Sequence, residues 1–264
     1  MAFIKLEVKQ LKKTYPALPT LKNISLTLEE NQFVSVLGPS GCGKSTLFSI
    51  IAGLTKPDAG HVMIDGKEYT HRTGRVSFMH QKDLLLPWKK ILDNAALPLF
   101  LKGVPIAEAR EQARTYFPLF GLEGFEGYYP SQLSGGMRQR AALLRTFLFS
   151  RDILLLDEPF GGLDAMTRQS MQTWLMGVLE ELNASILLIT HDVDEAMILS
   201  DKIYVLSQRP AVVKETFDVP LKKPRHVNLF TDPAYISLKK SILDCLSETY
   251  QGTEEGVRIT QSVN

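Results

Sequence analysis

Cysteine and long apolar segments are both scarce in this sequence. Its 264 residues include only two cysteines, Cys42 and Cys245. This pair fits no metal-ligand spacing and no disulfide framework, which is typical of a protein from a reducing compartment. No apolar run approaches the roughly 20 residues that span a membrane, and the charged residues spread through positions 1–10 are not typical of a signal peptide. We therefore expect any work at a membrane to need a separate membrane-spanning chain.

An excess of charge of either sign is also absent. Lys and Arg total 30 and Asp and Glu total 29, which leaves a formal net charge of +1. This balance provides no field that would attract nucleic acid, so we expect no nucleic-acid partner. Apolar residues make up 44% and charged residues 22% of the chain, as in ordinary globular proteins. The length suits a single domain over 1–264 with an inserted lobe.

The apolar pattern changes along the chain from that of strands to that of helices and back. Residues 3–8 and 21–28 alternate apolar and polar side chains, which predicts a short antiparallel β layer. Later, short apolar runs alternate with helical segments, which predicts an α/β fold with a parallel sheet. Strands are expected at 33–37, 62–64, 76–78, 153–156, 185–189, 203–206 and 212–219, and helices at 45–52, 165–182, 192–199 and 233–249.

The segment 91–149 has helical periodicity. It is interrupted at 103–105, at Pro118 and at 121–130, so we interpret it as an inserted lobe of several helices. The polar tail after Gly252 is expected to fray. The expected division is a core with its β layer over 1–90 and 150–220, a helical lobe over 91–149, and a C-terminal helix and tail over 221–264.

A glycine-rich loop follows the apolar run at 33–37 and precedes a helical segment, which is the context of a phosphate-binding P-loop. Glycines let successive N–H groups face inward around phosphates. Lys44 would add a positive charge near the β- and γ-phosphates, and Ser45 would offer its hydroxyl to Mg²⁺. An ordinary turn is the alternative, but it does not require Lys and Ser at this spacing. The expected phosphate contacts are Gly38, Pro39, Ser40, Gly41, Cys42, Gly43, Lys44, Ser45 and Thr46.

Two carboxylates, Asp157 and Glu158, follow the apolar run at 153–156. In α/β proteins, ligands bind at this carboxyl edge of the sheet. Asp157 would support Mg²⁺, and Glu158 could accept a proton from the attacking water. A strand that ends in solvated acids is the alternative, but the P-loop upstream favours the catalytic interpretation.

Ser134 and two glycines precede a helical segment at 139–149. A helix N-terminus of this kind could bind a second anion. From the residues alone, Ser134 could also be an ordinary N-cap that binds nothing further.

Taken in order, the motifs at 38–45, 133–136 and 155–158, and then His191, resemble those of the nucleotide-binding subunits of ABC transporters. The resemblance covers nearly the whole chain. It implies a P-loop NTPase core with a mixed, mainly parallel sheet, an N-terminal antiparallel β layer and an inserted helical lobe. It also implies that the chain binds ATP and Mg²⁺ and hydrolyses ATP.

In that family a working site needs a second copy or a close partner, so the resemblance implies an ATP-dependent head-to-tail dimer. Ser134 and Gly136 would contact the γ-phosphate bound by the other subunit, and Asp164 would bridge the dimer. The sequence departs from the family at Met137, where Gln is frequent, and at Gly162, where Ala or Ser is more usual. Neither departure changes a group expected to bind phosphate or metal, so we expect hydrolysis to survive.

The resemblance also gives roles to three single residues. Tyr15 would stack on adenine, Gln81 would touch Mg²⁺ and the lytic water, and His191 would contact the γ-phosphate and orient Glu158. Without the family, Tyr15 could be a tyrosine near a turn, Gln81 an exposed loop residue, and His191 part of an ordinary helix start. The expected catalytic set is Lys44, Gln81, Glu158 and His191, and the expected metal ligands are Ser45, Gln81 and Asp157.

A short cassette on its own chain favours an importer over the other classes of the family. Exporters often fuse the cassette to membrane-spanning helices, repair proteins interrupt it with a long coiled coil, and translation factors carry two cassettes in one chain. The segments 86–88, 92–94, 157–164 and 205–210 resemble the nitrate, sulfonate and taurine importer group, and related members take up pyrimidine vitamin precursors. The implied partners are transmembrane permease subunits and, indirectly, an extracytoplasmic solute-binding protein. The implied location is the cytoplasmic face of the cell membrane.

Three questions are left open by these residues. The apolar loop 84–88 could dock to a partner helix or pack inside the lobe. The basic run 222–226 could contact anionic lipid or be a solvated loop. The alternatives to an importer subunit are a soluble P-loop phosphotransferase, which would be active as a monomer without any role for Ser134, and a non-transport ABC switch protein.

Overall fold

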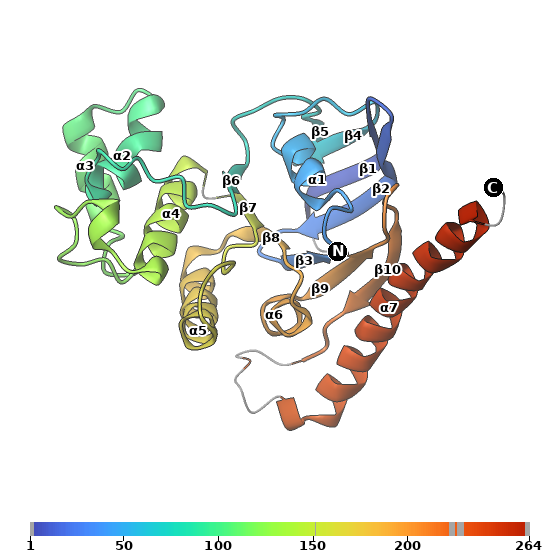
Figure 1. Cartoon of the computed structure of the whole chain (residues 1–264). Helices are drawn as coiled ribbons and strands as arrows, with labels where there is room; N and C mark the ends of the chain where they lie inside the picture. Colours follow the sequence, from blue (N-terminus) through green and yellow to red (C-terminus); the bar gives the residue numbers. More distant parts are fainter. Residues whose placement is uncertain (1–2, 151, 222–224, 226–229, 262–264) are drawn as a thin grey trace. The chain divides into compact units, whose positions relative to one another are not determined.

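In the computed structural model the chain forms two compact units, whose elements are labelled in Figure 1. The first unit combines Met1–Thr73 with Leu187–Asn264, and the second is Gly74–Ile186. The structure describes residues 3–150, 152–221, 225 and 230–261. Among these residues we find no helix that combines the length and the apolar character needed to traverse a bilayer.

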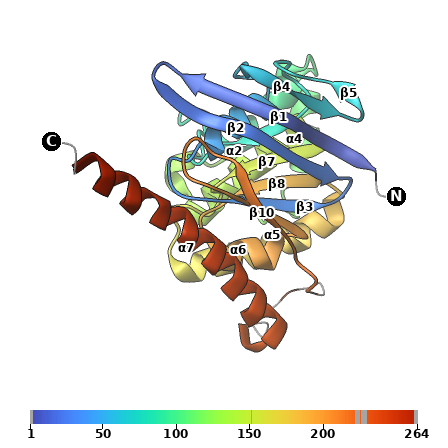
Figure 2. The same ribbon diagram turned by 90° about the vertical axis from the view of Figure 1, so that its right-hand side faces the viewer.

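The first unit begins with an antiparallel sheet in the order β2-β1-β4-β5 (Figure 2). β1 (Ile4–Tyr15) pairs with both β2 (Leu18–Glu29) and β4 (Ala59–Ile64), and β5 (Lys67–Glu68) pairs with β4. The apolar side chains in the second half of β2 are buried at alternate positions, because successive residues of a strand point to opposite faces. The predicted antiparallel β layer is therefore confirmed.

A second set of strands in the first unit forms a mixed sheet. β3 (Phe33–Leu37) pairs in parallel with β9 (Lys202–Leu206), and β9 pairs antiparallel with β10 (Val213–Asp218). The part of β8 (Ser185–Ile189) that belongs to this unit neighbours β3. Every residue of β3 and β8 is buried, which is typical of central strands covered on both faces. The strands predicted at 33–37 and 185–189 match these two at both ends.

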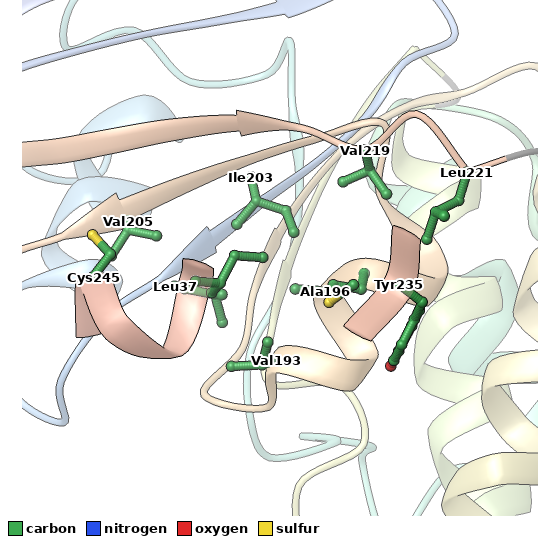
Figure 3. Packing of buried hydrophobic residues seen from close by; sticks show 11 residues of the cluster. Leu37, Val193, Ala196, Ile203, Val205, Val219, Leu221, Tyr235 and Cys245 are labelled. Carbon is green, nitrogen blue, oxygen red and sulfur yellow. The ribbon is translucent and has the colours of Figure 1, made fainter. Parts of the chain in front are cut away.

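The described part of the first unit contains three α-helices. α1 (Lys44–Ile51) follows the loop after β3, α6 (Val193–Leu199) follows β8, and α7 (Pro233–Gln261) comes last in the chain. Buried side chains from α6, α7, β3 and β9 form one hydrophobic cluster, shown in Figure 3. The cluster packs α7 against the helix that follows His191 and against β9, and it also contains Leu37 of the strand that leads into the glycine-rich loop.

The last helix is longer than the sequence pattern predicts. We expected a helix at 233–249 and a frayed tail after Gly252, but α7 continues to Gln261, so this prediction was wrong. A glycine inside a helix costs about 1 kcal/mol relative to alanine. That cost is too small to end a helix whose next residues include the good helix formers Glu254, Glu255 and Arg258.

The second unit contains the segment with helical periodicity. The breaks predicted at 103–105 and 121–130 fall between its helices. The predicted lobe, 91–149, lies within this unit, and its separation from a core that includes 150–186 stays a prediction. The elements are α2 (Ile91–Leu101), α3 (Ile106–Arg114), the 3-10 turn η1 (Pro130–Gln132), α4 (Gly135–Phe149) and α5 (Ala165–Leu182), with the parallel strands β6 (Ser77–Met79) and β7 (Ile153–Asp157).

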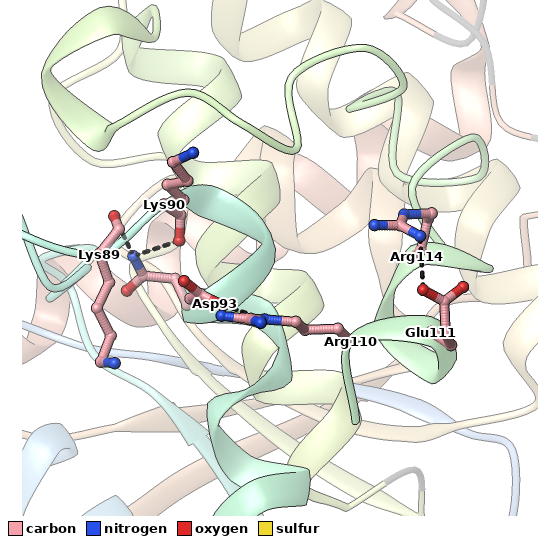
Figure 4. A network of polar contacts seen from close by, with 7 residues as sticks. Lys89, Lys90, Asp93, Arg110, Glu111 and Arg114 are labelled. Atoms are coloured by element: carbon pink, nitrogen blue, oxygen red, sulfur yellow. Dashed lines mark hydrogen bonds and ion pairs between the residues drawn. The ribbon is translucent and has the colours of Figure 1, made fainter. Parts of the chain in front are cut away.

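Adjacent residues of α2 hold two different neighbours (Figure 4). Arg110 Nε on α3 donates to Asp93 Oδ1 at 2.7 Å. The side-chain nitrogen of Asn94 donates to the carbonyl oxygens of Lys89 at 3.1 Å and Lys90 at 3.2 Å, just before the helix. α2 is therefore tied both to α3 and to the loop that precedes it.

Candidate functional site

The glycine-rich loop between β3 and α1 is tightly enclosed by neighbouring strands of the first unit. A Cβ atom at Gly43 would lie 2.8 Å from Leu21 Cδ2, and one at Gly38 would lie 3.1 Å from the carbonyl oxygen of Leu206. Gly41 and Gly43 also have φ angles of 74° and 121°, in a region that glycine enters without strain. A residue with a Cβ at position 38 or 43 would press on these neighbours and force them to shift, and at position 43 it would also strain the backbone.

The first turn of α1 suits an anion. Gly43 is the N-cap residue and makes no side-chain cap hydrogen bond, so the first N–H groups of the helix need another partner. A phosphate at this N-terminus would accept hydrogen bonds from these groups and interact favourably with the helix dipole. In the same turn the Ser45 residue is exposed and Thr46 is half-buried.

Lys44 folds back over the loop. The residue is 6% exposed, and its Nζ donates to the carbonyl oxygens of Gly38 at 2.8 Å and Pro39 at 2.9 Å. These bonds compensate for the burial of the ammonium group and hold its charge at the loop. Cys42 is buried beside it, and burial raises the pKa of the Cys42 thiol. Cys42 is therefore a small packing residue of the loop rather than a nucleophile.

Tyr15, the expected adenine contact, is the last residue of β1 and is 38% exposed. The end of the strand is fixed by Asp58, which accepts hydrogen bonds from Thr14 N at 2.6 Å and Lys13 Nζ at 3.0 Å. The Lys13 ammonium lies 5.5 Å from the centre of the Tyr15 ring. The ring is thus held in place with a face accessible enough for stacking, and the adenine contact itself stays a prediction.

His191 follows β8 at the edge of the sheet where the glycine-rich loop also begins. Thr190 N donates to Val36 O at 3.4 Å, which places the end of β8 beside the end of β3. Asp192 is the N-cap of α6 and accepts from Glu195 N at 3.0 Å. His191 itself is exposed. A capped helix therefore does begin just after His191, and the γ-phosphate contact of His191 stays a prediction.

In the second unit, Gln81 and Glu158 are brought together. Gln81 Nε2 donates to Glu158 Oε2 at 3.0 Å, because β6 and β7 run in parallel and both residues follow their strand ends. Asp157, the last residue of β7, is 7% exposed. Glu158 has a φ angle of 47°, a backbone conformation that costs roughly 1–2 kcal/mol for a residue with a Cβ. Such strain at a strand end is frequent at functional sites.

The donor set expected around Mg²⁺ fits that ion chemically. Ser45, Gln81 and Asp157 offer a hydroxyl, an amide oxygen and a carboxylate, which are the hard oxygen ligands that Mg²⁺ prefers. The bond to Glu158 uses the amide nitrogen of Gln81, which leaves the amide oxygen as its ligand atom. Within the described ranges, no group of three or more His, Cys, Asp or Glu side chains could hold a metal by itself. The chemistry of these donors therefore suits Mg²⁺, and their joint binding of the ion stays a prediction.

Ser134 caps α4, which begins at Gly135 rather than at the predicted position 139. The Ser134 hydroxyl oxygen accepts from Met137 N at 3.3 Å, so Ser134 is an N-cap residue, and this bond does not test whether it also contacts phosphate. The glycines lie inside the first turn because α5 packs closely there: a Cβ at Gly136 would lie 3.2 Å from Thr167 Cγ2. The phosphate contacts of Ser134 and Gly136 stay predictions. Met137 donates to the cap through its backbone N–H.

Asp164, expected to bridge a dimer, is the N-cap of α5 and accepts from Thr167 N at 3.0 Å. Hydrogen bonds from the Thr167 side chain and backbone hold the pKa of the Asp164 carboxyl below its usual value. Gly162 has a φ angle of 79°, and no heavy atom lies within 4 Å of the position of its missing Cβ. The backbone conformation, rather than lack of space, explains glycine at this departure from the family.

Two arginines of α4, which the sequence analysis did not single out, hold the loop after Gln81. Arg145 donates to the carbonyl oxygens of Asp83 at 2.6 Å and Leu84 at 2.7 Å. Arg138 forms an ion pair with the Asp83 carboxylate at 3.3 Å. Arg145 bonds to backbone oxygens of residues far away in the sequence, so no local sequence pattern predicts these contacts. They connect the loop after Gln81 to the helix that Ser134 caps.

The apolar loop 84–88 is divided between the surface and the interior. Leu84 is 53% and Trp88 is 70% exposed, whereas Leu85 is 7% exposed. Leu85 therefore packs inside the unit, and Leu84 and Trp88 present apolar side chains outward. Of the basic run 222–226, Arg225 is buried and cannot contact lipid. The other members, Lys222, Lys223, Pro224 and His226, lie outside the described residues.

Comparisons with known proteins agree with one another. Residues 21–161 match the ABC transporter family. The formylaminopyrimidine import ATP-binding protein of Halalkalibacterium halodurans is 42% identical over 232 residues, 87% of this chain and 91% of that protein. The aliphatic sulfonates import ATP-binding protein of Bacillus cereus is 37% identical over 235 residues, 89% of this chain and 91% of that protein. A solved dimeric, post-hydrolysis ATP-binding cassette with ADP and Pi is 30% identical, with a TM-score of 0.70 over 82% of this chain and 100% of that chain.

Proposed function

This chain belongs to the ABC transporter family and is an ABC-type ATPase, and from that membership we propose that it energises an importer whose membrane-spanning subunits are separate chains. Its relatives named above are import ATP-binding proteins and match nearly its whole length. Over the described residues, the chain offers a glycine-rich loop whose helix start suits phosphate and an exposed apolar loop, and both support this proposal. These are the two parts that such a subunit needs.

The hydrogen bond between Gln81 and Glu158, 3.0 Å long, carries the proposed hydrolysis. It orients the Glu158 carboxylate, which we assign as the base that accepts a proton from the attacking water. The P-loop amides and Lys44 bind the phosphates, and Lys44 offsets the negative charge of the transferred group. Bound Mg²⁺ would neutralise phosphate charge, with Ser45 and Asp157 among its ligands.

A second copy of the chain completes the proposed site. Ser134 and Gly136 would contact the γ-phosphate held by the other copy, Asp164 would lie at the contact, and His191 would touch the same phosphate. The solved cassette that is 30% identical to this chain is a dimer with ADP and Pi, which supports this arrangement. Tyr15 would stack on the adenine ring of the nucleotide in its own subunit.

Permease subunits are the proposed membrane partners. The exposed side chains of Leu84 and Trp88 suit an apolar contact with a helix of another protein. The loop that carries them is held by Arg145 and follows Gln81, so a movement at the nucleotide can reach the partner. The subunit would then work at the cytoplasmic face of the membrane, and a solute-binding protein would deliver the solute from the other side.

The proposed solute is a small anionic or organic molecule of the nitrate, sulfonate and taurine type. The names of the relatives, one for aliphatic sulfonates and one for formylaminopyrimidine, support this class. Solute recognition would lie in the partner proteins, so this part of the proposal rests on the relatives alone.

Size-exclusion chromatography of the Glu158→Gln variant with and without ATP tests the proposal. This variant should bind ATP without hydrolysing it and should elute as a dimer only with ATP. Ser134→Arg in the same background should remove the dimer, because the long cation would occupy the phosphate contact. Ser131→Arg, an exposed residue of η1 close in sequence, is the matched control and should leave the dimer intact.

Two outcomes would refute the proposal. One is a Glu158→Gln protein that stays monomeric at saturating ATP. The other is a wild-type monomer that transfers the γ-phosphate to a small acceptor at a rate that Ser134→Arg does not change, which would indicate a soluble phosphotransferase.

A further inference from the structure

The short helix α6, which begins two residues after His191, is held at both ends by the C-terminal part of the chain. Its N-terminal turn is bonded to α7, and its C-terminal end is bonded to a single buried arginine. All of these residues belong to the first unit. None of them was expected to act in nucleotide hydrolysis.

The contact at the N-terminal end centres on Asp194. Its carboxylate accepts a hydrogen bond from the Tyr235 hydroxyl at 2.5 Å and from Lys239 Nζ at 2.8 Å. Tyr235 is 1% exposed, and burial together with the nearby Asp194 carboxylate raises the pKa of its hydroxyl. Tyr235 therefore stays protonated at neutral pH and remains a hydrogen-bond donor to the first turn of α6.

The contact at the C-terminal end centres on Arg225, which is 2% exposed. Its guanidinium donates to the carbonyl oxygens of Met197 at 3.0 Å and Ile198 at 3.3 Å, and also to that of Ser200. The last carbonyls of a helix have no partner within the helix, and a cation there interacts favourably with the helix dipole. The same guanidinium donates to Leu221 O at 3.0 Å, which ties the end of α6 to the segment after β10.

The hydrophobic cluster also includes a residue next to the P-loop. In Figure 3, Tyr235 of α7 lies near Ala196 of α6, and Val193 of α6 and Leu37 of β3 belong to the same cluster. Leu37 is the residue directly before Gly38. The C-terminal helix thus packs on the helix that follows His191, and this helix packs on the strand that leads into the P-loop.

We propose that Tyr235 and Arg225 are positioning residues for hydrolysis: they fix α6 against β3 and so hold His191 at its place beside the P-loop. The cap formed by Asp192 and the bond from Thr190 to Val36 transmit the position of α6 to the His191 backbone. Small misplacements of a catalytic group have large effects on rate, on the order of a hundredfold for 1 Å. This inference rests on the proposed function, because it assumes that His191 contacts the γ-phosphate.

The variants Tyr235→Phe and Arg225→Lys test it in the full chain. Tyr235→Phe keeps the ring in the cluster and removes only the bond to Asp194. Arg225→Lys keeps the charge but cannot reach several carbonyls at once. We expect each to lower kcat for ATP by roughly three- to tenfold, a fraction of the loss for a full 1 Å displacement, with little change in KM. Tyr128→Phe and Arg114→Lys, both in the second unit, are matched controls that should leave kcat unchanged.

A double-mutant cycle separates positioning from general stability. In a His191→Ala background, Tyr235→Phe should have no further effect on kcat, because the group that it positions is gone. Thermal unfolding and binding of a fluorescent ATP analogue should show that the Tyr235→Phe protein is folded and binds nucleotide as wild type does. A merely structural role would lower kcat by the same factor in both backgrounds.

The results distinguish the two proposals. Wild-type protein that binds ATP but never hydrolyses it would overturn the proposed function and this inference with it. Active wild-type protein whose kcat is unchanged by Tyr235→Phe and by Arg225→Lys would overturn the inference alone, and so would equal losses with and without His191.

Discussion

Replacing Asn94 by alanine would release the loop that follows Gln81. The Asn94 residue is fully buried. Its Oδ1 accepts from Leu86 N at 2.7 Å, and its Nδ2 donates to Leu86 O and Lys89 O, both at 3.1 Å, and to Lys90 O at 3.2 Å. One side chain therefore closes the loop on the first turn of α2, and no other residue type offers an acceptor and donors in this arrangement at this length.

The size of the effect follows from these contacts. A side-chain amide has one acceptor oxygen and two donor hydrogens, so the four contacts amount to about three hydrogen bonds. Each contributes about 1 kcal/mol net, and buried partners that are left unpaired raise the loss. We expect Asn94→Ala to lower the free energy of unfolding by about 2–4 kcal/mol. Asn94→Asp should cost at least as much, because it would place a carboxylate against carbonyl oxygens.

Urea unfolding followed by tryptophan fluorescence measures the loss, and hydrogen exchange at the Leu86 amide shows where it arises. The matched control is Gln112→Ala, which removes one exposed hydrogen bond to Glu108 on α3 and should change stability by less than about 0.5 kcal/mol. An Asn94→Ala protein as stable as this control, with the Leu86 amide still protected, would show that the side chain does not hold the loop.

Three further changes test the site and its surroundings. Gln81→Ala should lower kcat for ATP by on the order of tenfold or more, because the Glu158 carboxylate loses its 3.0 Å hydrogen bond. Steady-state kinetics should show this loss with an unchanged KM, and an unchanged kcat would contradict the role of Gln81. Gly162→Ala should destabilise the protein by about 1–2 kcal/mol in thermal unfolding, because φ is 79° there, and a neutral result would mean that the turn can change its conformation. Burial raises the pKa of Cys42, and burial together with a hydrogen bond to Glu215 raises the pKa of Cys245 to about 11. A thiol reagent at pH 8 should therefore label both cysteines far more slowly in the folded chain than in urea. Equal labelling rates would contradict the burial of these thiols.

The elements that could be predicted are those whose pattern is local. β3, β8 and α5 match their predicted ends, because each is a continuous apolar run or a helix framed by a cap and a turn. The ABC ATPase fold was predicted from four short motifs and is confirmed by the solved cassette at a TM-score of 0.70. The start of α4 was misplaced, because Gly135 and Gly136 have low helix propensity by themselves. Their place in the helix depends on the close packing of α5, which the sequence does not display.

Residues that act through distant backbone oxygens could not be predicted. Arg225 stands in a run of basic residues that resembles a solvated loop, yet it is buried against the end of α6 and against Leu221. Arg145 reaches Leu84, 61 positions away, in the same manner. A guanidinium has five donors in a rigid fork, so one arginine can satisfy several carbonyls whose own residue types are irrelevant. The motifs therefore predict which residues meet the nucleotide, whereas the residues that hold those motifs in place have to be found from the folded chain.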